Sequence, residues 1–154
     1  MYSPEEEIES LLLSFSKTVS SQMIRSTLDM ISATISKKTI EESFEIFART
    51  HVENDKPTLE VALLTRNNVI HDFTNTFDEY QTTYWKLSSA TQVILKTYNM
   101  SETQEVRAGK PYRAELEISD GVKFLTYAAE GDRRVVNSLI KFGQACLRAI
   151  SKLP

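Results

Sequence analysis

The chain has 154 residues, of which 41% are hydrophobic and 25% are charged, and this is the composition of an ordinary globular domain. Its formal net charge is −3, so it lacks the overall surplus of Lys and Arg with which an extended nucleic-acid surface displaces counterions. The only cysteine, Cys146, excludes an internal disulfide and disfavours a zinc site built from cysteines.

The start of the chain is acidic, with Glu5, Glu6 and Glu7, whereas secretory and mitochondrial leaders are basic at this place. No apolar run approaches the roughly 18–20 residues that a helix needs to cross a bilayer. These two features predict a cytoplasmic protein without a membrane span.

Helical spacing characterises the first third of the chain. Ser3 and Glu6 form a capping box at the start of a predicted helix. Its apolar stripe recurs at steps of three and four residues and consists of Ile8, Leu11, Leu12, Phe15 and Val19. A second stripe, out of register with the first, follows a predicted break near Ser20 and Ser21 and consists of Ile24, Leu28, Ile31 and Ile35.

Another capping box begins at Thr39 and predicts a further helix through Phe44, Phe47 and Ala48. The N-terminal segment is therefore expected to form three short helices, or one long and one short helix. The spacing of apolar residues becomes strand-like after residues 53–57. We predict a helical segment over residues 1–54 and an antiparallel β domain with a C-terminal helix over residues 55–154.

Two hairpins are predicted in the β domain. The first joins strands at residues 58–65 and 69–74 through the turn at Arg66, Asn67 and Asn68. The second joins residues 112–118, where apolar and polar residues alternate, to residues 122–127 through Asp120 and Gly121, the strongest short hairpin signal. Two further strands are expected between the hairpins, at residues 80–87 and 93–98, with a polar loop at residues 101–110.

The last predicted element is an amphipathic helix capped by Asp132. Gly143 lies within its apolar stripe, where we expect it to permit the close approach of a strand. The stripe consists of Val135, Val136, Leu139, Ile140, Gly143, Cys146, Leu147 and Ile150. The sequence as a whole predicts an α+β fold in which N-terminal helices precede a curved antiparallel sheet that is closed by this helix.

Antiparallel strands over about residues 58–128, followed by one amphipathic helix, resemble the layout of a pleckstrin-homology-like (PH-like) barrel. Residues 63–70 (LLTRNNVI) are similar to a hairpin of bacterial PH-like domains, and residues 116–124 (LEISDGVKF) with the final helix are similar to their closing hairpin and helix. The resemblance covers roughly residues 57–150. Such barrels have about seven strands, whereas the sequence shows six, with residues 103–107 as a candidate for another.

The resemblance implies a scaffold that binds lipid headgroups, peptides or sister subunits, with the helix plugging one end of the barrel. It carries no binding residues over to this chain, because the bacterial members lack a specific residue pattern that matches here. Fold-level similarity therefore says little about what the protein binds.

The residues that most often carry chemistry do not form a constellation. His71 and Asp72 are adjacent in a predicted strand, so their side chains are expected on opposite faces. With His51 as the other histidine, no metal site is expected, and Cys146 is expected to pack in the core. The four glycines form neither a P-loop nor a dinucleotide-binding loop, so we expect no cofactor.

Two groups of residues remain as candidates for binding. A local anion-binding patch is predicted from Arg66, Lys110, Arg113, Arg133 and Arg134, with scattered surface charge as the alternative. The aromatic residues concentrated in the strand region are expected mainly in the core, but several on one outer face would mark a binding surface. These aromatic residues are Tyr80, Tyr84, Trp85, Tyr98, Tyr112 and Tyr127.

The leading functional hypothesis is a non-catalytic binding or assembly module that acts through protein partners, self-association or an anionic ligand. This hypothesis includes a lipid headgroup or another small molecule among the ligands, whereas binding of nucleic acid is not expected. One alternative is a small enzyme or ligand carrier with a pocket in the curved sheet. The other is an intracellular chaperone or secretion adaptor that dimerises through its N-terminal helices.

Overall fold

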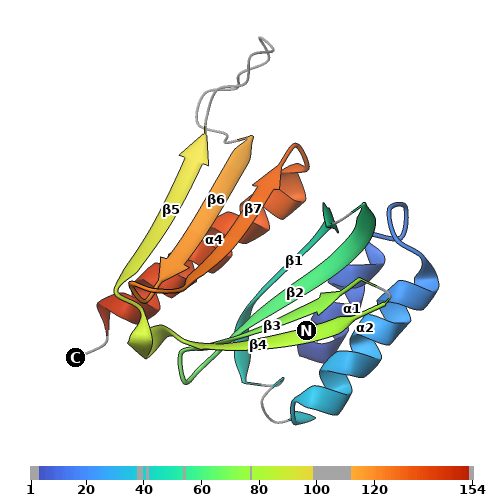
Figure 1. Ribbon diagram of the computed structural model, residues 1–154, viewed down its shortest axis with the longest axis horizontal. Helices are drawn as coiled ribbons and strands as arrows, with labels where there is room; N and C mark the ends of the chain where they lie inside the picture. Colours follow the sequence, from blue (N-terminus) through green and yellow to red (C-terminus); the bar gives the residue numbers. More distant parts are fainter. Residues whose placement is uncertain are drawn as a thin grey trace. The chain divides into compact units, whose positions relative to one another are not determined.

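The computed structural model describes residues 4–37, 40, 42–53, 55–76, 78–98 and 112–152 (Figure 1). The chain divides into two compact units, Met1–Trp85 and Lys86–Pro154. The loop expected at residues 101–110, the candidate strand at 103–107 and the capping residues Ser3 and Thr39 lie outside the described residues.

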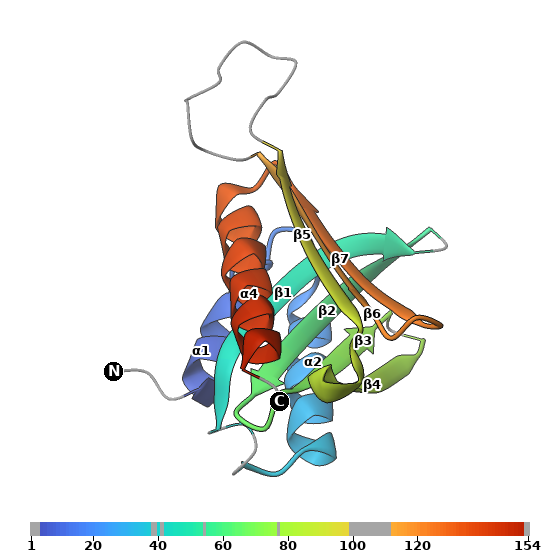
Figure 2. The same cartoon turned by 90° about the vertical axis from the view of Figure 1, so that its left-hand side faces the viewer.

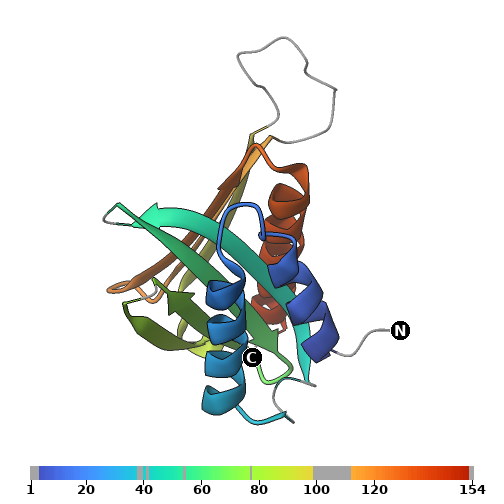
Figure 3. The ribbon, with the colours of Figure 1, turned by 90° about the vertical axis from the view of Figure 1, so that its right-hand side faces the viewer.

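The first unit is built from two helices and a four-stranded sheet. Its elements are α1 (Pro4–Leu13), α2 (Ser21–Thr34), β1 (Ser43–Glu53), β2 (Lys56–Thr65), β3 (Val69–Asn75) and β4 (Tyr80–Lys86). The strand order is β1-β2-β3-β4, and the pairs β1–β2 and β2–β3 are antiparallel. Helix α1 contacts β1, and α2 contacts β2 and β3, so the two helices lie side by side on the sheet (Figure 3).

The two N-terminal helices form because their apolar stripes have a sheet to pack on. Ile8 and Leu12 of α1 are buried, as are Met23, Ile24 and Ile31 of α2. The predicted break is confirmed, because the Ser20 side chain caps α2 by accepting a hydrogen bond of 3.2 Å from the backbone N–H of Met23. Both stripes are therefore covered within one chain.

The helix predicted through Phe44, Phe47 and Ala48 is wrong, because these residues belong to strand β1. β1 pairs with β2 from Ser43↔Thr65 to Glu53↔Lys56, and this long ladder overrides a local capping signal. The boundary predicted between residues 54 and 55 accordingly falls in the turn between β1 and β2, and both strands lie in the first unit.

The second unit is a three-stranded sheet with one helix. After the short 3₁₀ helix η1 (Leu87–Ser89) it contains β5 (Gln92–Tyr98), β6 (Arg113–Ser119), β7 (Phe124–Glu130) and α4 (Arg133–Ser151). The strands are antiparallel in the order β5-β6-β7. α4 lies against this sheet and contacts all three strands (Figure 2). The ring of Phe142 on α4 meets that of Tyr127 on β7 edge to face, with 6.0 Å between their centroids.

The turn and cap signals of the second unit are confirmed. Gly121 has a φ of 95°, which a residue with a Cβ rarely adopts, and Asp120 Oδ1 accepts hydrogen bonds from the N–H groups of Val122 and Lys123. Asp132 caps α4 by accepting a hydrogen bond from the N–H of Arg134.

The α+β class, the N-terminal helices, the antiparallel strands and the C-terminal helix packed on a sheet are confirmed. Within the described residues the strands hydrogen-bond as two sheets, and a closed barrel is not among them. None of the described helices is long and apolar enough to span a membrane.

Candidate functional site

Strand β4 forms one edge of the four-stranded sheet. It is neighboured by β3 on one side, and no other described strand hydrogen-bonds to it. Five of its seven residues are exposed and the other two, Thr83 and Trp85, are half-buried. A strand in this position presents unpaired backbone N–H and C=O groups along its outer side, which is how one chain recruits a strand from another.

Aromatic side chains make this edge unusual. Tyr80 is 56% exposed and Tyr84 is 54% exposed, and their spacing places both on the same face of the strand. The ring of Tyr84 also meets that of His71 on β3 edge to face, with 5.3 Å between centroids. Two of the six aromatic residues named from the sequence, Tyr80 and Tyr84, therefore share an exposed face at β4. Elsewhere the prediction of core aromatics is confirmed for Tyr127, which is fully buried.

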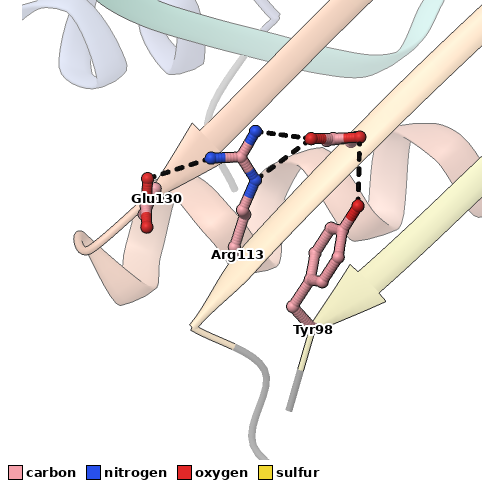
Figure 4. Close-up of polar contacts among 4 residues, drawn as sticks. Tyr98, Arg113 and Glu130 are labelled. Carbon is pink, nitrogen blue, oxygen red and sulfur yellow. Dashed lines mark hydrogen bonds and ion pairs between the residues drawn. The ribbon is translucent and has the colours of Figure 1, made fainter. Parts of the chain in front are cut away.

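The predicted patch residue Arg113 lies in a cluster of opposite charges near one end of the β5–β7 sheet (Figure 4). Its Nε donates to Glu115 Oε1 at 3.1 Å and its Nη1 donates to Glu130 Oε2 at 3.1 Å. Tyr98 donates its hydroxyl to Glu115 Oε2 at 3.3 Å, and the guanidinium lies 5.7 Å from the centre of the Tyr98 ring.

These contacts fix the charge of the cluster. The hydrogen bond from Arg113 lowers the pKa of Glu115 and, from the other side, the bond to Glu115 raises the pKa of Arg113. One guanidinium is therefore matched by two carboxylates. An incoming anion would have to displace Glu115 or Glu130, so this cluster is poorly suited to binding phosphate or a lipid headgroup.

The other residues of the predicted anion patch are distributed over the chain. Arg133 and Arg134 are exposed in the first turn of α4, and Arg134 Nη2 lies 3.6 Å from Asp132 Oδ2. Arg66 is exposed in the turn between β2 and β3 of the first unit. Lys110 lies outside the described residues. Arg113, Arg133 and Arg134 share the second unit, whereas Arg66 belongs to the first.

A buried charge cluster in the first unit was not among the predicted site residues. Glu60 on β2 is 7% exposed and Asp72 on β3 is 4% exposed. Arg49 lies opposite Glu60 on β1, and its Nε donates to Glu60 Oε1 at 2.6 Å. The sequence did carry a signal, because Glu60 stands between Leu59 and the apolar run at residues 61–64.

Burial raises the pKa of Glu60 to about 8, and the charge of Asp72 and a hydrogen bond with that carboxyl act in the same direction. Arg49 opposes them by stabilising the ionised form. The buried surroundings therefore favour the protonated form of Glu60 more strongly than Arg49 favours the ionised form.

The remaining candidates have structural roles. Burial lowers the pKa of His71, so its ring is neutral at pH 7 and suited to its contact with Tyr84. Cys146 is fully buried in α4, as expected from its place in the apolar stripe. Within the described part of the chain, His, Cys, Asp and Glu residues do not gather into a group that could hold a metal ion.

Comparisons with known proteins found no match to this chain among family models, curated proteins or solved structures. Its function must therefore be inferred from its own residues.

Proposed function

We propose that this chain is a non-catalytic protein-binding and assembly module that recruits its partner along the edge of β4. The observation that carries the proposal is an edge strand whose aromatic side chains are more than half exposed, at Tyr80 and Tyr84. Tyr is enriched where proteins bind one another, and an unpaired strand edge supplies backbone hydrogen bonds to an extended partner.

A PH-like scaffold is part of the proposal. Its support is the order of elements: seven strands among the described residues are followed by one amphipathic helix that packs on a sheet. The sequence pattern contained six of these strands, and the additional one is β1, which the helical prediction had hidden. The resemblance to PH-like domains thus rests on an element order close to the expected one.

Two alternatives differ in their support. Dimerisation through the N-terminal helices would need an apolar surface left open on them, and the burial of Ile8, Leu12, Met23 and Ile24 within the chain disfavours it. An anionic ligand is disfavoured by the carboxylates around Arg113. The partner proposed here is accordingly a protein strand.

Site-specific photo-cross-linking in the cells that produce the protein tests this proposal. A photoreactive phenylalanine analogue replaces Tyr80, and a control places the same residue at Asn137, an exposed position of α4. We expect a discrete adduct from position 80 that fades when Thr82→Pro removes a backbone donor from the strand. Adducts that are equal from both positions, or absent from position 80, would refute the proposal.

A second candidate function, a small ligand carrier or enzyme, is favoured by the burial of Glu60 beside Asp72, which raises the pKa of Glu60. Strongly shifted carboxyl groups are common at functional sites and also occur in structural networks. A ligand that raises the melting temperature of the native chain but not of Glu60→Gln would support this candidate.

A further inference from the structure

The amino-acid sequence of β4 bears on which protein strand it recruits. The strand reads YQTTYWK from Tyr80 to Lys86, and it contains one charge, at its end, and neither Pro nor Gly. Natural edge strands are commonly protected from pairing by internal charges, prolines or bulges. Residues 80–85 contain neither a charged residue nor a proline, so their composition permits pairing with another strand.

The strand is also complementary to itself. In an antiparallel pair centred on Thr83, each Tyr80 lies opposite Lys86 of the second copy, and each Thr82 lies opposite Tyr84. On the other face Gln81 lies opposite Trp85 of the second copy, and the two Thr83 residues lie opposite each other. Pairs of an aromatic with a β-branched residue, pairs of threonines, and a cation beside an aromatic ring are all favourable across strands.

The backbone geometry allows this register. Along a strand, the residues that direct N–H and C=O outward alternate with those that direct them inward, so the outward set is either all odd or all even. Pairing about Thr83 joins odd to odd and even to even positions. The outward groups of the two copies therefore meet each other whichever set they belong to, and no like charges are opposed.

We infer that the partner strand is β4 of a second copy of this chain, which pairs antiparallel about Thr83 and joins two four-stranded sheets across a two-fold axis. Such a contact uses the same surface on both copies and closes on itself as a dimer. The inference rests on the proposed function, because it assigns a partner to the same edge.

Charge substitutions at the centre of the pairing test the inference through the solution mass, measured by light scattering over a series of protein concentrations. The native chain is expected to approach twice its monomer mass at high concentration. Thr83→Lys and Thr83→Glu each place like charges opposite each other and should remain monomers. An equimolar mixture of the two variants should regain the doubled mass, which also proves that both are folded.

The matched control is Thr97→Lys, the same substitution at an exposed position of the edge strand β5, which should dimerise like the native chain. A native chain that stays monomeric at every concentration overturns the inference. The inference is also overturned if Thr83→Lys and Thr83→Glu dimerise as well as the native chain. It is overturned too if their equimolar mixture stays monomeric. An adduct between Tyr80 and a different protein, found with a monomeric chain, would retain the proposed function and reject the second copy as partner.

Discussion

Gly143 of α4 lies directly against Leu95 of β5, so closely that a Cβ atom on Gly143 would come within 2.8 Å of Leu95 Cδ1. The same atom would come within 3.3 Å of Leu116 Cδ1 on β6. The close approach expected from a glycine in the apolar stripe is thus confirmed. Helix and sheet are packed without room for a side chain at this position.

Substitution of Gly143 should therefore destabilise the protein in proportion to side-chain size. Gly143→Val is expected to lower the free energy of unfolding by about 1–3 kcal/mol through overpacking. Gly143→Ala should leave the free energy of unfolding nearly unchanged. The roughly 1 kcal/mol by which alanine favours a helix over glycine offsets the close contact of its Cβ with Leu95. Urea denaturation measures both, and Leu95→Ala should reduce the effect of Gly143→Val. Additive effects of the two changes would contradict the contact.

Asn75 should be a second sensitive position, because it joins β3 to α2 through buried groups. Its Nδ2 donates to Thr27 Oγ1 at 2.9 Å and to Ser26 Oγ at 2.9 Å. We expect Asn75→Ala to lower the free energy of unfolding by about 1–3 kcal/mol. Asn75→Asp keeps the size and shape of the side chain but loses the N–H donors, so it should destabilise the protein at least as much as Asn75→Ala. Asn137→Ala, at an exposed position, serves as the control and should stay within about 0.5 kcal/mol of the native chain.

The raised pKa of Glu60 predicts a specific dependence of stability on pH. The pKa of Glu60 rises from 4.5 in the unfolded chain to about 8 in the folded one, so the folded state binds the proton more tightly. The stabilisation is complete below pH 4.5 and is lost as the pH rises through about 8. The pKa of His71 is lowered from 6.5 in the folded chain, so the unfolded chain binds this proton more tightly. His71 therefore lowers the free energy of unfolding as the pH falls below 6.5, which is the opposite dependence.

The effect of Glu60 is accordingly isolated between pH 6.5 and 8, where the free energy of unfolding should fall by up to about 2 kcal/mol. Thermal or urea unfolding at a series of pH values measures this slope. In Glu60→Gln the slope should disappear, whereas Glu79→Gln, at an exposed position, should preserve it. A slope that survives Glu60→Gln would show that another group is responsible.

The carboxylates around Arg113 should suppress binding to anionic surfaces. We expect the native chain to bind weakly to anionic vesicles at low salt, measured by co-sedimentation. Replacing Glu115 and Glu130 by Gln exposes the charge of Arg113 and should increase the bound fraction, and adding Arg113→Gln should reverse the increase. Strong native binding that is lost in Arg133→Glu with Arg134→Glu would instead support the predicted anion patch.

The first unit should not tolerate division at the predicted boundary. A chain that begins at Asp55 lacks α1, α2 and β1, and it exposes the edge of β2 together with the buried Leu59, Val61 and Leu63. We expect this shortened chain to be unfolded or aggregated in gel filtration and circular dichroism. A soluble monomer with native strand content would support the predicted boundary between residues 54 and 55.

Several elements could be predicted because their residues reveal a period over enough positions. The alternation at residues 112–118, with Asp120 and Gly121 after it, defined the β6–β7 hairpin, and the long stripe that ends near Ile150 defined α4. β1 escaped prediction because Phe44, Phe47 and Ala48 suit a short helix as well as a buried strand. Such short apolar runs are ambiguous until a partner strand is known.

The candidate site shows the same division. The aromatic content of β4 was visible in the sequence, but its position at a sheet edge depends on the order in which the strands pair. The basic residue Arg113 was visible too, but its neutralisation by Glu130 requires β6 and β7 to align in one register. Neither relationship follows from residues that are adjacent in the chain.

The sequence by itself determined the α+β class, the Asp132 cap of α4 and the hairpin turns, since these depend on backbone geometry and on hydrogen bonds between residues close in the chain. Only the tertiary structure decided that residues 43–53 form a strand, that Glu60 is buried beside Asp72 with its pKa raised, and that β4 is an edge. The physical reason is that strand pairing brings distant residues together, and their burial and charge take effect only once they are neighbours.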